Sequence, residues 1–173
     1  EISRHKSFAA DKKYFEEVMD EERKYMNEFS LAFNQLLLQS GVVRIENEPW
    51  LQKAAKVEQM CKSKSSYKQL SGKRCADHSV RSCLEYYFQL MSSREYGKAA
   101  VLAEVMLCFD SKSSNTLFLI ARAEAGAGNK KGCERSFKKA VKKGLVLNKW
   151  IEEDLLLLQV LSQEEIKKMF AGK

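Results

Sequence analysis

The chain has 173 residues, of which 45% are hydrophobic, and its formal net charge is +7. This length suffices for one compact domain or one short solenoid, and no apolar run approaches the roughly 20 residues that a membrane span needs. One proline and eight glycines favour helices with short connections over strands. Because the chain begins at Glu1 rather than at a methionine, we expect it to be part of a longer protein.

A long helical pattern covers residues 8–39, after a polar start at residues 1–7 that we expect to be frayed. Its apolar residues keep to one face: Phe15, Val18, Met19, Tyr25, Met26, Phe29, Phe33, Leu36 and Leu37. Ser7 or Asp11 could cap its start, and Gly41 is the expected stop. The pattern fits one long helix or two antiparallel ones, and its aromatic spacing also allows a degenerate first repeat.

A second helix is predicted to begin at Pro49, which fits the first helical position, and to end near Cys61. Residues 62–76 are rich in lysine and serine and contain Gly72, so we expect a loop or a weak helix around Tyr67 to Leu70, with a flexible insertion as a further alternative. Asp77 is then the expected N-cap of the next helix. The sequence thus divides into N-terminal helices at 1–76 and a second region at 77–173.

The second region shows helical hairpins that repeat with the period of about 34 residues known for tetratricopeptide (TPR) repeats. Small and aromatic residues recur at this spacing: Ala99, Ala103 and Met106 in one hairpin, and Cys133, Phe137 and Ala140 in the next. Turns are expected at 93–95, at 110–112 and at Gly128-Asn129, which places one helix at 96–109. Period and residue pattern together are typical of TPR units.

Two further helices are predicted after Gly144. Asn148 can cap a helix that carries Trp150, Ile151, Leu155 and Leu158. Ser162 and Glu165 have the spacing of a capping box, which predicts a last helix from Gln163 to about Phe170. A solenoid needs such a terminal element because its final repeat otherwise leaves an apolar face in water.

Residues 77–159 resemble TPR domains, and most closely those of FKBP-type immunophilins and AIP-like co-chaperones. The resemblance rests on these residues: Tyr96-Gly97-Lys98-Ala99, Phe109-Asp110-Ser111, Leu117-Phe118, Ala121, Ala123-Glu124-Ala125, Phe137-x-x-Ala140 and the closing Lys168-Met169-Phe170. It implies an all-α solenoid of right-handed hairpins and a co-chaperone-like, non-catalytic module that binds a chaperone or a peptide segment. It also implies that an isomerase domain could lie elsewhere in the longer protein.

Chaperone-binding members of this family hold an acidic C-terminus with a carboxylate clamp of one asparagine, one lysine and one arginine. The resemblance places these positions at Glu85, Asn115 and Leu119, and all three depart from the family pattern. Glu85 would repel a carboxylate, and Leu119 supplies no charge to bind one. We therefore expect a degenerate clamp.

The first helices of TPR hairpins line a concave groove. The residues placed there are Arg81, Leu84, Glu85, Phe88, Asn115, Phe118, Leu119 and Arg122. An apolar groove edged by two arginines would suit an extended peptide or a partner helix with some acidic side chains. The alternative is that neighbouring helices of the same chain, such as residues 1–40, fill it.

Positive charge is concentrated in residues 114–147, which hold eight basic residues and two acids. Lys131, Arg135, Lys138 and Lys142 recur at helical spacing, opposite Cys133 and Phe137. This basic face is either a solvated helix surface or a site for an acidic partner or an RNA backbone, and the lack of interleaved aromatics argues against base recognition.

The remaining chemistry is sparse. The five cysteines form no C-x-x-C pair, and with two histidines there is no zinc spacing, so we expect no metal, no cofactor and buried thiols such as Cys83 and Cys133. The cysteine pattern predicts a reduced protein in the cytoplasm, with the nucleus as an alternative. No nucleophile and base are suitably spaced, so the sequence predicts no enzyme. Dimerisation stays open.

Overall fold

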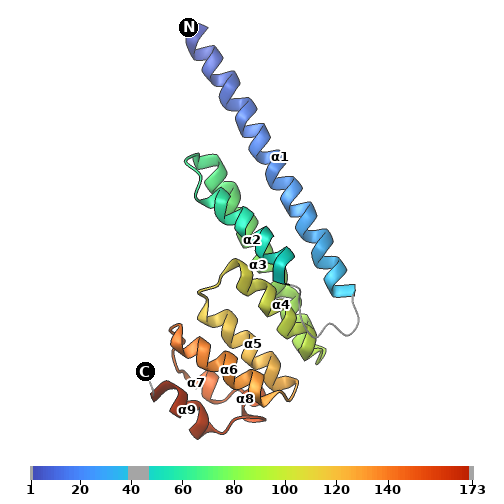
Figure 1. The fold of residues 1–173 in the computed structure, drawn as a ribbon, viewed down its shortest axis with the longest axis vertical. Helices are drawn as coiled ribbons and strands as arrows, with labels where there is room; N and C mark the ends of the chain where they lie inside the picture. Colours follow the sequence, from blue (N-terminus) through green and yellow to red (C-terminus); the bar gives the residue numbers. More distant parts are fainter. Residues whose placement is uncertain (1, 39–46, 172–173) are drawn as a thin grey trace. The chain divides into compact units, whose positions relative to one another are not determined.

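The structure, a computed structural model, describes the backbone of residues 2–38 and 47–171 and the side chains of 11–38 and 49–171 (Figure 1). All regular secondary structure in these residues is α-helical, which confirms the predicted all-α class. None of the helices in these ranges is both long enough and apolar enough to cross a membrane. The predicted stop at Gly41 lies outside the described residues.

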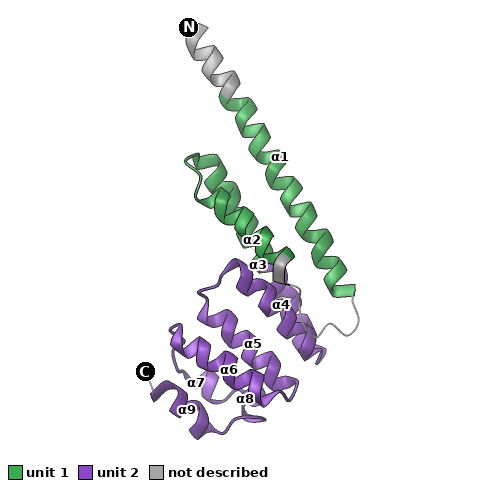
Figure 2. Ribbon diagram, viewed as in Figure 1, with its two compact units in different colours: residues 1–39, 48–80 green, residues 40–47, 81–173 purple. Residues whose placement is uncertain are grey.

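The chain forms two compact units (Figure 2). Unit 1 comprises Glu1–Gln39 and Glu48–Val80, and unit 2 comprises Ser40–Asn47 and Arg81–Lys173. The boundary after Val80 falls a few residues beyond the predicted division at 76/77. It lies within a helix rather than in a linker, because α3 (Ser66–Ser92) contributes its first part to unit 1 and its last part to unit 2.

In unit 1, α1 is a single helix, Ile2–Leu38, which decides between the one-helix and two-helix alternatives. No glycine or proline interrupts these residues, so nothing in the local sequence ends the helix early. Residues 2–7 are helical rather than frayed. Ser7 and Asp11 therefore lie inside the helix and do not cap it, contrary to the prediction.

The second helix, α2 (Asn47–Cys61), begins before Pro49, which sits in the first turn, where the N–H groups have no helical partner anyway. Of the alternatives for residues 62–76, the helix around Tyr67 to Leu70 is confirmed, because α3 starts at Ser66, and the loop or flexible insertion is wrong from that residue onward. Gly72 is required by packing: a Cβ at this position would lie 2.7 Å from the backbone nitrogen of Cys61. Asp77 is consequently in mid-helix and is not an N-cap.

Aromatic side chains form the core of unit 1. The ring of Phe29 lies 5.6 Å from Phe33, 5.7 Å from Trp50 and 5.8 Å from His78, centroid to centroid. The hydroxyls of Tyr25 and Ser79 are hydrogen-bonded at 2.8 Å. These contacts join α1 to α2 and α3 within the unit.

In unit 2, α4 (Tyr96–Phe109), α5 (Ser114–Gly126) and α6 (Lys130–Lys142) follow α3, and α5 packs against both α4 and α6. The bounds of α4 are those predicted. α4 and α6 start 34 residues apart, and α3 and α5 end 34 residues apart, which is the predicted period. The paired core positions are all buried: Ala99, Ala103, Met106, Cys133, Phe137 and Ala140.

Three helix ends in unit 2 share one backbone geometry. Each has a residue in the left-handed region: Arg94 (φ 61°), Gly128 (φ 73°) and Gly144 (φ 103°). In each, the following N–H donates to a carbonyl five residues earlier: Glu95 to Leu90 at 2.8 Å, Asn129 to Glu124 at 2.9 Å and Leu145 to Ala140 at 3.0 Å. This is the Schellman motif, which satisfies carbonyls at a helix C-terminus. The first two of these turns recur at the same spacing as the helices that they end.

The chain ends with α7 (Lys149–Glu152), α8 (Leu155–Leu158) and α9 (Gln163–Ala171). Asn148 caps α7 as predicted, and Ser162 and Glu165 form the predicted capping box, with bonds of 2.7 and 3.1 Å. The helix predicted across Trp150 and Leu158 is wrong, because it is split in two. The cause is Asp154, which caps α8 and so starts a new helix there.

Candidate functional site

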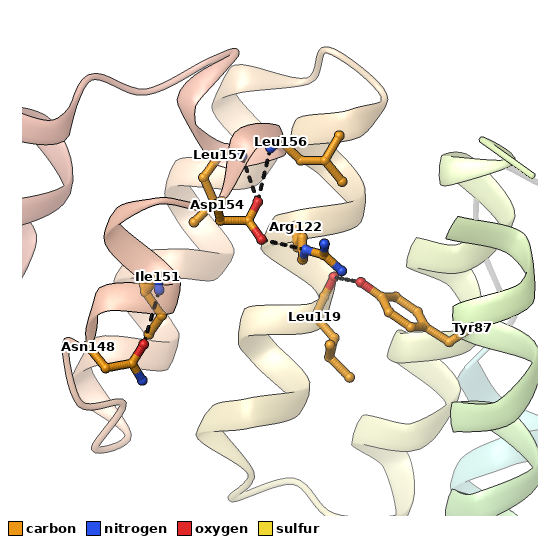
Figure 3. A network of polar contacts seen from close by, with 8 residues as sticks. All are labelled: Tyr87, Leu119, Arg122, Asn148, Ile151, Asp154, Leu156 and Leu157. Carbon is orange, nitrogen blue, oxygen red and sulfur yellow. Dashed lines mark hydrogen bonds and ion pairs between the residues drawn. The ribbon is translucent and has the colours of Figure 1, made fainter. Parts of the chain in front are cut away.

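Unit 2 contains a buried ion pair between α5 and the start of α8 (Figure 3). Arg122 Nε donates to Asp154 Oδ2 at 2.6 Å, and 2% of the Asp154 side chain is exposed, against 23% of Arg122. The other carboxylate oxygen accepts from the N–H groups of Leu156 and Leu157 at 3.0 and 3.1 Å. One carboxylate thus caps α8 and fixes it to α5.

The same region joins α3 to α5. Tyr87, whose ring is buried, donates its hydroxyl to the carbonyl oxygen of Leu119 at 2.9 Å (Figure 3). Burial raises the pKa of the Tyr87 phenol well above its usual range, so the group stays protonated and remains a donor. A specific side-chain bond therefore links α3 to α5 within unit 2.

Two of the predicted groove residues, Phe118 and Arg122, are covered by the C-terminal segment. Phe118 is buried, with its ring 5.1 Å from that of Trp150 on α7. The guanidinium of Arg122 lies 5.7 Å from the same indole ring, in addition to its bond with Asp154. These two side chains serve packing within the chain. Arg122 is not available as a free arginine at the edge of a groove.

Other predicted groove residues are accessible. Arg81, Glu85 and Phe88 on α3 and Asn115 in the first turn of α5 are exposed, and Phe88 has 49% of its surface in solvent. The remaining two, Leu84 and Leu119, are half-buried. At the clamp positions the structure therefore places an exposed carboxylate, an exposed amide and a half-buried leucine.

Sequence reasoning missed the closure of the α5 face by residues 148–158. The signal was present, because an aspartate directly before an apolar run, as in Asp154-Leu155-Leu156-Leu157, is a helix-start pattern. This pattern predicts that one helix ends and a new one begins at Asp154. It does not predict the long-range bond to Arg122, which depends on how α8 packs.

The basic face lies on α6 as predicted, and Lys131, Arg135, Lys138 and Lys142 are all exposed. In the described part of the chain, the ion pairs of α6 join Lys138 to Glu134 at 3.3 Å and Lys130 to Glu165 at 2.9 Å. The opposite side of the helix is core. The four cations thus form one exposed row.

Burial makes the thiols of Cys75, Cys83 and Cys133 unreactive. Burial raises the pKa of Cys83 and of Cys133 to about 12 and that of Cys75 to about 11, and all five thiols are free. Among the residues that the structure describes, no three His, Cys, Asp or Glu side chains are grouped so as to hold a metal ion.

No protein-family model, curated protein or solved structure matches this chain. The fold and the site define an all-helical protein whose second unit exposes two distinct surfaces. One is the α3 and α5 surface around Phe88, and the other is the basic face of α6. The function of each has to be inferred from its own residues.

Proposed function

We propose that unit 2 is a non-catalytic protein-interaction module built on TPR-type hairpins, in a longer, co-chaperone-like protein. The recurrence of helix ends carries this proposal, because the left-handed turn residues Arg94 and Gly128 and the starts of α4 and α6 keep the same spacing. Stacked helical repeats of this period present their first helices to partner segments.

The accessible surface on α3 would be the contact site. Arg81, Glu85 and Phe88 are spaced four and three residues apart, so they lie along one side of the helix. An exposed aromatic ring beside a fixed core is the kind of anchor that dominates binding energy at interfaces. Arg81 and Glu85 both precede the ring along this side of α3, which favours a partner with an apolar side chain followed by a basic and then an acidic one.

A partner that ends in an acidic carboxylate fits this surface less well. Arg122 already binds Asp154, and Glu85 is negative, so the inner face offers Arg81 as its accessible cation among the predicted groove residues. The proposed ligand is therefore an internal segment of a protein, extended or helical, rather than a chaperone tail.

The test is a selection of peptides from a random library against the whole chain, followed by affinity measurement by fluorescence anisotropy. Phe88→Ala should weaken the selected peptides by about tenfold or more, the effect expected of an anchor residue. Tyr86→Ala is the matched control, because that ring is 39% exposed on another side of α3. Peptides that bind both variants and Arg81→Glu equally would refute the proposal, as would the failure to select any peptide.

A further inference from the structure

The basic face of α6 is a row of four exposed cations, Lys131, Arg135, Lys138 and Lys142. Their spacing of four, three and four residues keeps them on one side of the helix over about 16 Å. In the part of the chain that the structure describes, Lys131, Arg135 and Lys142 have no carboxylate within ion-pair distance. Within the described residues, three of the four charges of the row are therefore not neutralised by an ion pair, and Lys138 is paired with Glu134.

Helix stability does not account for this row. Cations are favoured at a helix C-terminus, which suits Lys139 and Lys142 in the last turn. Lys131 lies in the first turn of α6, where the helix dipole disfavours positive charge and where no acidic residue is present, and Arg135 lies between the two end turns, where the dipole has little effect. The charge of Lys131 works against the helix that carries it, and the dipole does not account for that of Arg135, so a role in binding is the better explanation.

The composition of the face selects the kind of partner. Protein interfaces are centred on apolar or aromatic anchors, and exposed ion pairs alone add little affinity. The single aromatic residue of α6, Phe137, is fully buried on the opposite side, so no anchor lies in the row. A polyphosphate differs, because each contacted phosphate releases condensed counterions and every cation then contributes to affinity.

We propose that the basic face of α6 binds the phosphate backbone of a nucleic-acid duplex without recognising its bases. Single strands are usually held by bases stacked on exposed aromatic rings, and α6 offers none, which favours a duplex. The surface is separate from the α3 residues proposed for the protein partner, so the two proposals stand or fall independently.

The experiment measures anisotropy of labelled DNA duplexes of about 20 base pairs, in two unrelated sequences, over a range of NaCl concentrations. Four phosphate contacts predict a slope of log affinity against log salt of about −3.6, equal for both sequences. Replacing Lys131, Arg135, Lys138 and Lys142 by glutamine should remove most of that slope and lower the affinity by at least about tenfold at low salt.

The matched control replaces Lys13, Lys24, Lys64 and Lys73 by glutamine. These lysines are exposed on unit 1, and the variant has the same net charge as the first. It should keep nearly the full slope. Circular dichroism checks that both variants are folded, and Lys131→Gln with Arg135→Gln serves as a milder pair that should remove about half of the slope.

Two results would overturn the proposal. If both fourfold variants weaken duplex binding equally, the effect is one of net charge and not of this face. If a polyglutamate peptide binds more tightly than the duplex at the same salt, and the α6 variant abolishes that binding, the partner is an acidic protein.

Discussion

At the scale of single residues, Phe137 on α6 and Phe88 on α3 show how a core position differs from an exposed one. Its side chain is fully buried, with its ring 6.0 Å from Phe118 and 5.7 Å from Phe170. It therefore joins α5, α6 and α9 around one core position. Phe88, by contrast, is half exposed on α3. The same residue type thus supports stability at one site and is free for contact at the other.

Phe137→Ala should lower the free energy of unfolding by about 3–5 kcal/mol, because it leaves a cavity where three helices meet. Phe88→Ala should cost far less, about 1 kcal/mol or below, since its ring loses little burial. Urea unfolding followed by circular dichroism compares the two. If both substitutions lowered the free energy of unfolding equally, the assignment of Phe137 to the core would be wrong.

Arg94 is the one described non-glycine residue with a positive φ, at a position where the ends of α5 and α6 have glycine. A left-handed backbone costs a non-glycine residue about 1 kcal/mol or more. Arg94→Gly should therefore raise the unfolding free energy by about 0.5–1 kcal/mol, after allowance for the looser unfolded chain. Ser93→Gly, one residue earlier and without a positive φ, is the control and should not stabilise. A loss of stability in Arg94→Gly would contradict the strain argument.

At the scale of helices, the sequence located those elements whose ends are marked by local signals. The bounds of α4 follow from the turns on either side, and the starts of α7 and α9 follow from Asn148 and from the capping box. The error at 62–76 has a packing cause. Gly72 resembles a helix breaker in the sequence, but the contact with Cys61 is what requires glycine there.

The connection of α8 to α5 depends on Asp154. Asp154→Ala should cost about 3–5 kcal/mol, because it leaves Arg122 without its partner in a largely buried site, and the lost cap adds about 1 kcal/mol. Asp154→Asn keeps an oxygen that can cap α8 and removes the charge, so the difference between the two variants reports the cap. Chemical unfolding measures both. Near-wild-type stability of Asp154→Ala would show that α8 is not fixed by this bond.

The capping box of α9 predicts a pH dependence. The backbone N–H of Ser162, and then the Lys130 ammonium, lower the pKa of Glu165 from 4.5 to about 2. A carboxyl group whose pKa is lowered by folding stabilises the folded state above its unfolded pKa. That contribution should thus be complete above about pH 5 and decline toward pH 2. Glu165→Gln keeps the capping geometry and should flatten this part of the pH profile of α9 helicity. If Glu165→Gln left the pH profile of α9 helicity unchanged, this prediction would be wrong.

At the scale of the whole molecule, the candidate site was only partly predictable. The exposure of the basic face on α6 could be predicted because helical periodicity assigns residues to a side of a helix, whereas the α3 residues were placed by the resemblance to TPR hairpins; a binding role for either surface stays a prediction. Arg122 and Phe118 were expected in an open groove, and the structure places them under Trp150 and Asp154. Which segment covers a face is decided by contacts between residues far apart in the sequence, and a pattern within one helix does not contain that information.

This closure sharpens the expectation for chaperone tails. An acidic C-terminal peptide would meet Glu85 and Leu119 where the resemblance requires polar and basic groups, and it would compete with Asp154 for Arg122. Each missing charge-assisted hydrogen bond is worth about 1.5–3 kcal/mol, so two of them move a micromolar contact toward millimolar.

A labelled tail peptide titrated into the chain should therefore bind weakly or not at all. Glu85→Asn combined with Leu119→Arg should increase its affinity if the surrounding surface is otherwise suitable, because the repelling charge is removed and a cation is supplied. Leu84→Arg, a neighbouring half-buried position, controls for added charge alone and should gain less. Low-micromolar binding to the unmodified chain, abolished by Arg81→Ala, would show that Arg81 replaces the clamp, and the expectation would then be wrong.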